Sequence, residues 1–179
     1  RTGAEARAGP DQIATRFGPT GAIVLAKLVE VSGVLTDLNL ANNQLCGLDH
    51  RGRGVYTSEG INAIAEALRV NSALTSVNLR ANQIGDEGAK AIGEALRVNS
   101  VLTSLNLMSN KVGAEGAKAI AGALEVNSVR TNQNLRSTAI GSEGATANGD
   151  DLRVNGGRQP SELGLNPMGD GADAGRQNG

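Results

Sequence analysis

Two consecutive segments decide the fold: LTSVNLRANQIGDEGAKAIGEALRVNSV (residues 74–101) and LTSLNLMSNKVGAEGAKAIAGALEVNSV (residues 102–129). They share one pattern, and the step from Leu74 to Leu102 is 28 residues. Self-similarity at a fixed step of this size is typical of repeat proteins, in which each unit buries its apolar face against its neighbours. The pair therefore predicts a stacked repeat architecture.

The first part of each unit has the pattern of a strand. In the segment 74–82, Val77 and Leu79 alternate with polar residues, so one face of a short strand is expected to be buried. Ser76, Asn78 and Arg80 then lie on the opposite face.

The second part has the pattern of an amphipathic helix that begins near Asp86. One predicted face is apolar, and the other is charged. The apolar face holds Gly88, Ala89, Ile92, Ala95 and Leu96, and the charged face holds Glu87, Lys90, Glu94 and Arg97. Asp86 is expected to be the N-cap, and Asn71, Asn99 and Asn127 are expected to end helices in the left-handed conformation.

Stacked strand–turn–helix units give a parallel sheet with helices on one side. Neighbouring strands lie ~4.8 Å apart, whereas packed helices need roughly 8–10 Å, so the two layers cannot both be straight. The predicted fold is therefore an α/β curved solenoid, with parallel strands on the concave face and helices on the convex face.

The repeat frame divides the whole chain. An irregular segment (1–16) precedes a half unit (17–34) and a first unit (35–73) that is 11 residues longer than the next two, 74–101 and 102–129. A fourth unit (130–157) keeps the frame but places polar residues at apolar positions, and a Gly-rich tail (158–179) follows. We expect units one to three to be the stable part, the fourth unit to open first and the tail to be frayed.

The pattern LxxLxLxxNxIGxEGAxAIxxAL resembles the 28-residue leucine-rich repeat of the ribonuclease-inhibitor type. Related arrays occur in ribonuclease inhibitor, in Ran GTPase-activating protein and in nucleotide-binding immune receptors. The resemblance implies that Asn43, Asn82 and Asn110 form a ladder whose amides bond backbone groups of the turns between units. Thr138 stands at the corresponding position of the fourth unit and is too short for this role.

The exposed strand positions are the expected partner-binding residues. They comprise Asp37, Asn39, Ser76, Asn78, Arg80, Ser104, Asn106, Met108, Asn132, Asn134 and Arg136. Ala41 is also expected to be exposed on this face. The asparagine at the second exposed position of each strand (Asn39, Asn78, Asn106 and Asn134) is either a recognition stripe or a consensus residue of the repeat. Arg80, Met108 and Arg136 break the repetition, so they are the better candidates for specificity, and Arg and Met are enriched at interfaces.

The extra block of the first unit, Cys46–Tyr56, contains the only Cys, His and Tyr of the chain. Its residues His50, Arg51, Arg53 and Tyr56 are interpreted as a rim loop, because insertions in repeats fall on one face and are often used in binding. A neutral surface insertion is the alternative, since such insertions cost little free energy. Cys46 and His50 would supply half of a zinc site, and no further ligands lie nearby, so no metal is expected.

Composition argues against several other functions. The formal net charge is −1, the chain has one cysteine, and its longest apolar runs are too short to span a bilayer. With one histidine, neither HExxH nor a two-histidine relay is possible, and GSEG at 141–144 is not GxSxG. We therefore expect no enzyme activity, cofactor, nucleic acid or membrane partner, and a cytoplasmic, reducing location.

Three functional hypotheses follow. The first is a protein-interaction module that binds a macromolecular protein partner through the concave face and loop rim. The second, from the resemblance to Ran GTPase-activating protein, is a regulator of a small GTPase. The third is a repeat fragment of a larger sensor of the innate-immune type.

Overall fold

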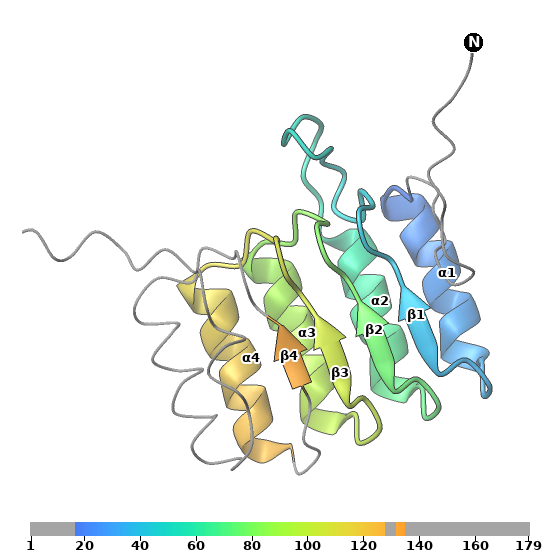
Figure 1. Ribbon diagram of the computed structural model, residues 1–179. Coiled ribbons are helices and arrows are strands. Elements are labelled where there is room, and N and C mark those ends of the chain that lie inside the picture. The colour runs from blue at the N-terminus through green and yellow to red at the C-terminus, as the bar shows by residue number, and fades with distance from the viewer. Residues whose placement is uncertain (1–16, 128–131, 135–179) are drawn as a thin grey trace, which may run out of the picture.

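The computed structural model describes residues 17–127 and, for the backbone only, 132–134 (Figure 1). Helices and strands alternate along the chain. The elements are α1 (Pro19–Val31), β1 (Asp37–Asn39), α2 (Glu59–Val70), β2 (Ser76–Asn78), α3 (Asp86–Val98), β3 (Ser104–Asn106), α4 (Ala114–Val126) and β4 (Asn132–Asn134). Beyond β4, the fourth unit and the tail lie outside the described residues, as does the segment 1–16.

The strands form a single four-stranded sheet in the order β1-β2-β3-β4, and every neighbouring pair is parallel. Leu38, Val77 and Leu105 lie side by side in the register of the sheet, and all three are buried. This arrangement follows from the repeat, because equivalent residues of successive units pair with one another.

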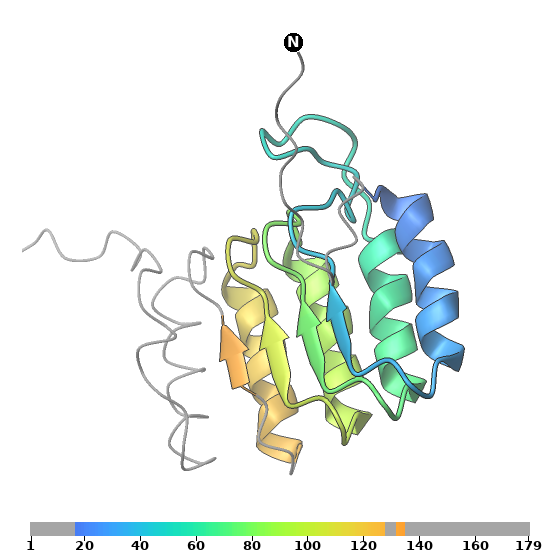
Figure 2. The same cartoon turned by 45° about the vertical axis from the view of Figure 1, so that its right-hand side comes forward.

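All four helices cover the same face of the sheet, and the open face is concave (Figures 1 and 2). The molecule is a curved solenoid of the predicted α/β class. Small residues bring the helices close together. A Cβ atom at Gly93 would lie only 2.7 Å from the carbonyl oxygen of Ala119 in α4, so this contact between α3 and α4 requires glycine.

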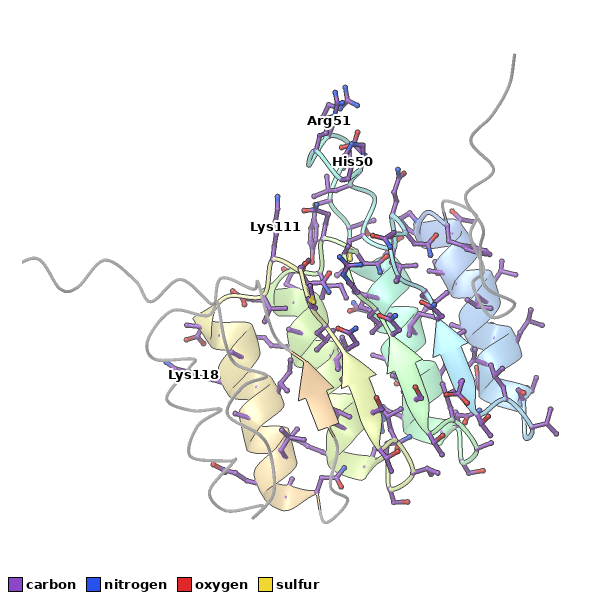
Figure 3. The ribbon with its side chains drawn as sticks, in the orientation of Figure 1. His50, Arg51, Lys111 and Lys118 are labelled. Carbon is purple, nitrogen blue, oxygen red and sulfur yellow. The ribbon has the colours of Figure 1, made fainter. Side chains whose placement is uncertain are left out.

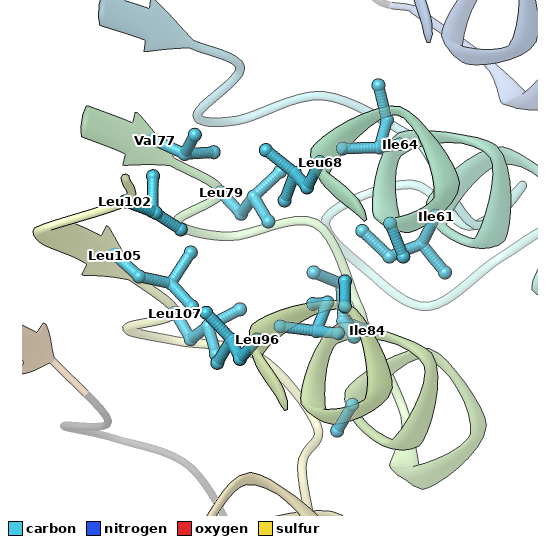
Figure 4. Close-up of a cluster of buried hydrophobic side chains, with 14 of the residues drawn as sticks. Ile61, Ile64, Leu68, Val77, Leu79, Ile84, Leu96, Leu102, Leu105 and Leu107 are labelled. Carbon is cyan, nitrogen blue, oxygen red and sulfur yellow. The ribbon is translucent and has the colours of Figure 1, made fainter. Parts of the chain in front are cut away.

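The core is a thin apolar layer between the sheet and the helices. Figure 4 shows Val77 and Leu79 directed toward Ile64 and Leu68 of α2, with Leu105 and Leu107 forming the next layer. The predicted apolar face of α3 is buried, and Glu87, Lys90, Glu94 and Arg97 are exposed. Burial of this kind contributes roughly 25 cal/mol per Å² of apolar surface, so each added unit stabilises its neighbours.

Two expectations about helix ends are wrong. Gly85, with extended backbone, is the N-cap of α3, whereas Asp86 is the first helical residue and makes no capping hydrogen bond within α3. Asn71, Asn99 and Asn127 end their helices with φ of −73°, −73° and −86°, which is not left-handed. Both side-chain types are used for contacts between units instead, as described below.

Candidate functional site

The open face of the sheet carries columns of polar side chains. Asp37, Ser76 and Ser104 are neighbours in the strand register, as are Asn39, Asn78 and Asn106. None of these six residues is buried. In β4, Asn132 and Asn134 continue the two columns in backbone register, while Arg136 lies outside the described residues. The strand spacing therefore places accessible polar positions at regular intervals across the face.

The asparagine column has a backbone role. Asn39 Oδ1 accepts a hydrogen bond from Ala41 N–H at 3.1 Å, and Asn78 Oδ1 accepts one from Arg80 N–H at the same distance. Asn106 Oδ1 accepts the corresponding bond from the N–H of Met108 at 3.0 Å. A short turn of this kind fixes the chain where it leaves the strand. The repeated asparagine is thus explained by local structure, with or without a partner.

Residues just beyond the strands differ between units. Arg80 is exposed and Met108 is half-buried, whereas Ala41 is only 8% exposed, contrary to the expectation that it faces solvent. Arg80 and Met108 are therefore the accessible positions at which units two and three present different chemistry on otherwise equivalent backbones.

A shallow hollow of about 500 Å³ lies over β1 and β2 on the concave side. Its wall includes Val34, which is 90% exposed, together with Thr36 and Asp37. An apolar side chain this exposed beside polar strand residues gives the face both apolar and hydrogen-bonding character, as protein-binding surfaces have.

A first asparagine ladder runs beyond the carboxyl ends of the strands. Asn82 Nδ2 donates to Leu40 O at 2.8 Å and Leu79 O at 2.9 Å, and Asn110 Nδ2 donates to Leu79 O at 3.0 Å. Asn110 Oδ1 accepts from the N–H groups of Asn82 and Ile84 at 2.9 and 3.1 Å. Asn43 begins the series by accepting a hydrogen bond from Phe17 N–H at 2.8 Å. Each amide thus joins its own turn to that of the preceding unit.

The ladder has one gap. Asn82 Oδ1 is buried and has no hydrogen-bond partner among the described residues. The repeat geometry would supply the N–H groups of Asn43 and the residue two positions later. Neither of these groups donates to Asn82 Oδ1, and the chain enters the insertion Cys46–Tyr56 directly after them. A buried acceptor without a donor is costly, so the insertion alters the scaffold locally.

A second asparagine ladder, which sequence reasoning missed, runs along the opposite rim. Asn99 Nδ2 donates to Leu68 O at 2.6 Å and Asn71 O at 3.3 Å, while its Oδ1 accepts from Val101 N–H and Leu102 N–H. Asn71 and Asn127 make equivalent bonds to the units before them. These asparagines recur at the repeat step in the sequence, but their position after a helix favours the interpretation that they end helices.

Asp86 also connects units. Its Oδ1 accepts hydrogen bonds from Gly113 N–H at 2.7 Å and Gly116 N–H at 2.9 Å. These amides lie at the start of α4, where an anionic side chain is favoured by unsatisfied N–H groups and the helix dipole. Asp86 therefore caps the next helix rather than its own.

The insertion Cys46–Tyr56 folds around one carboxylate. Asp49 Oδ1 accepts from the backbone N–H groups of Arg51 and Arg53, each at 2.9 Å. Asp49 Oδ2 accepts from the Arg53 guanidinium at 2.9 Å. The hydrogen bond from Arg53 N–H, together with its guanidinium, lowers the pKa of Asp49. A bridge between Leu48 and Gly54 closes the loop, so it has defined structure.

The insertion Cys46–Tyr56 stands above the rim that the turns after the strands form (Figure 3). This rim is called the upper rim. His50 and Arg51 are exposed near its tip, and Arg51 Nε donates to His50 Nε2 at 3.3 Å. Lys111, from the turn before α4, reaches toward the loop: its Nζ lies 3.4 Å from where a Cβ of Gly52 would be. The loop thus spans units one to three.

The base of the insertion is packed against the scaffold. Tyr56 is 37% exposed, and its hydroxyl lies beside Gly85 of the next unit; burial raises the pKa of this phenol. Cys46 is fully buried, and burial raises the pKa of its thiol to about 12. A thiol held neutral in this way is a core residue and not a nucleophile.

Within 17–127, no cluster of three or more His, Cys, Asp or Glu side chains is arranged to hold a metal ion. Over the same part of the chain, none of the helices has the length and hydropathy needed to cross a membrane.

Comparisons with known proteins agree with this fold. A family model described as "Leucine Rich repeat" matches residues 70–93 and 98–121. No curated protein sequence matches the chain significantly. The matched segments repeat at the step found in the sequence, so these two segments are leucine-rich repeats; membership of the ribonuclease-inhibitor type stays a prediction.

Two solved structures are similar to the chain. One, described as "Leiomodin-1 Actin-Binding Site 2 (ABS2)", has a TM-score of 0.59 and 25% identity over 76% of this chain and 73% of that chain. The other, the tropomodulin C-terminal domain from Caenorhabditis elegans, has a TM-score of 0.59 and 18% identity over 76% of each chain. The tropomodulin likeness concerns the fold alone.

Proposed function

We propose that this chain is a protein-interaction module that binds a macromolecular partner through its concave face and the adjoining loop rim. The observation that carries the proposal is the open strand face, where in-register columns of accessible side chains change chemistry at Arg80 and Met108. The backbones of units two and three are equivalent at these positions, so folding does not explain why the side chains differ. Variation on an invariant scaffold is the pattern expected of a recognition surface.

The scaffold suits binding without rearrangement. The two asparagine ladders hold both rims of the sheet, so partner contacts would be made by side chains on a fixed backbone. Such preformed surfaces avoid the entropic cost of ordering a loop on association.

The likeness to a protein described as an actin-binding site makes actin the first partner to test. That likeness has 25% identity and covers most of both chains. The expected result is reversible binding of actin monomers that weakens when Arg80 or Met108 is changed. No binding to monomeric or filamentous actin would remove actin as the partner.

The wider proposal is tested by capture of partner proteins on the immobilised chain, followed by mass spectrometry. Three proteins are compared: wild type, the concave variant Arg80→Glu/Met108→Asp, and a convex control Lys90→Glu/Glu94→Lys. We expect one set of proteins to be captured by wild type and the control but lost from the concave variant. Equal capture by all three would rule out the concave face. A single-turnover GTP hydrolysis assay separates this module from the GTPase-activating alternative.

A further inference from the structure

We infer that the insertion Cys46–Tyr56 and the turns beneath it form a binding site for an acidic peptide segment. The inference rests on the proposed protein-binding function and deepens it, because it names a location and a chemistry for part of the partner. It concerns the upper rim and not the strand face.

The site is a hollow of about 270 Å³ between the loop and the turns of three consecutive units. Most of its lining side chains are polar. They are Asn42, Asn43, Gln44, His50, Ala81, Gln83 and Ser109. The hollow is large enough for a few peptide groups but not for a folded domain, so an extended segment fits it best.

Two cations without a carboxylate partner lie on the loop and on a turn near it. Arg53 is neutralised by Asp49, but no acidic side chain among the described residues pairs with Arg51 or Lys111. Figure 3 shows Arg51 beside His50 near the tip of the loop and Lys111 on a turn below it, and Lys111 Nζ lies 3.4 Å from where a Cβ of Gly52 would be. An anionic ligand that contacts both cations would gain favourable electrostatic interactions with each of them.

Two buried acceptors lie at or beside the wall of the hollow. Gln83 lines it, and Gln83 Oε1 is buried with no partner among the described residues. Asn82 Oδ1, from the adjoining residue, is also buried with no hydrogen-bond partner among the described residues. Buried acceptors of this kind gain most from a ligand that brings N–H groups, because their lost hydration is then replaced. A ligand with N–H donors and negative charge is an acidic peptide.

Nucleic acid fits these features less well. Single strands are bound by stacking of bases on accessible aromatic side chains along a basic groove. Of the two aromatic residues in the chain, Tyr56 places its hydroxyl against Gly85, and Phe17 packs against the core. The formal net charge of the chain is −1, which does not favour binding of a polyanion.

The experiment measures fluorescence anisotropy of a short labelled Glu–Gly peptide titrated with the full chain at low salt, with a Gln–Gly peptide as the uncharged probe. The rim variant is Arg51→Glu/Lys111→Glu. The matched control Lys90→Glu/Arg97→Glu makes the same charge change on the exposed face of α3. Circular dichroism verifies that each variant is folded.

We expect wild type and the α3 control to bind the Glu–Gly peptide with similar affinity, and the rim variant to bind at least tenfold more weakly. The variant Gln83→Asn shortens the acceptor, keeps a residue that tolerates left-handed backbone, and should weaken binding roughly fivefold. Affinity should fall as salt is added.

Four results would each overturn the inference: no binding by wild type, equal binding of the Gln–Gly peptide, equal losses in the rim and α3 variants, or tighter binding of oligothymidylate than of the acidic peptide. The proposed function fails separately. If the concave variant still loses its captured partners while peptide binding is absent, the inference is wrong and the proposed function stands.

Discussion

Replacing Asn99 with alanine removes a side chain that joins two units at once. Its amide nitrogen donates to Leu68 O at 2.6 Å and Asn71 O at 3.3 Å. Its oxygen accepts from Val101 N–H at 2.9 Å and Leu102 N–H at 2.7 Å. Asn99 is 4% exposed, so water cannot readily replace the missing amide.

The expected loss follows from these contacts. Three of the four hydrogen bonds are short, and each contributes a net ~1 kcal/mol, more where a buried group is left without a partner. The fourth, at 3.3 Å, adds little. Asn99→Ala should therefore lower the free energy of unfolding by about 3 kcal/mol. This is a large share of the 5–15 kcal/mol that is usual for folded domains.

The assay is urea unfolding followed by circular dichroism, with Asn62→Ala as the matched control. Asn62 lies on the exposed side of α2, where its Nδ2 donates to Ser58 Oγ at 3.3 Å. Its replacement should change stability by less than about 0.5 kcal/mol, since alanine favours the helix. A loss of under about 1 kcal/mol for Asn99→Ala, or equal losses for the two variants, would refute the reasoning.

Three further predictions concern the backbone conformation at Ala81, the backbone conformation at Gly47 and the burial of Cys46. Ala81 has φ of +56°, so Ala81→Gly should stabilise the protein by roughly 0.5–1 kcal/mol in urea unfolding, whereas Ala91→Gly within α3 should destabilise it by about 1 kcal/mol. Gly47 has φ of +77°, and a Cβ there would lie 2.2 Å from a backbone carbonyl oxygen. Gly47→Ala should thus lower the melting temperature clearly, while Gly33→Ala, with no atom within 4 Å, should not. Because burial raises the pKa of Cys46 to about 12, its contribution to stability should be complete below the unfolded thiol pKa of ~8.5 and decline as the pH rises toward 12. A thiol reagent at neutral pH should modify this residue far more slowly in native protein than in urea; equal rates would contradict its burial.

The fold class could be predicted because the same strand and helix patterns occur in more than one unit. Val77 and Leu79 define a strand by their alternation, Ile92 and Leu96 define a helical face, and the next unit repeats both. The parallel, in-register sheet then follows from stacking identical units. The mismatch between strand and helix spacing gives the curvature.

The second ladder could not be predicted in the same way. An asparagine after a helix is compatible with left-handed termination and with a hydrogen bond to the preceding unit, and both recur at the repeat step. The choice depends on the distance between neighbouring helix ends, which places Leu68 O within reach of Asn99 Nδ2. The role of Asp86 could not be predicted for the same reason, because its partners Gly113 and Gly116 belong to the next unit.

The insertion was the least predictable part of the candidate site. Its sequence contains the features that fold it: Asp49 as an acceptor for several N–H groups, and glycines at positions with positive φ. Nothing in its composition shows that it lies over the next two units, where Lys111 approaches Gly52 and Tyr56 approaches Gly85. Those contacts depend on how far the array extends beneath the loop.

The positions of the two ladders bear on how this protein can change its partner without losing its fold. Asn71 and Asn99 hold the chain before β2 and β3, and Asn82 and Asn110 hold it after them, so these two strands are fixed at both ends by amides that contact the preceding unit. Side chains on the open face contribute little to these contacts between units. Substitutions at Arg80 should therefore alter binding with little effect on unfolding, because sites that share no contacts are close to additive. The rim beneath the insertion differs, because Asn82 Oδ1 is buried there with no partner among the described residues, and the next residue, Gln83, lines the hollow. A ligand that fills this hollow should raise the free energy of unfolding as well as bind, since it would bind only the folded chain.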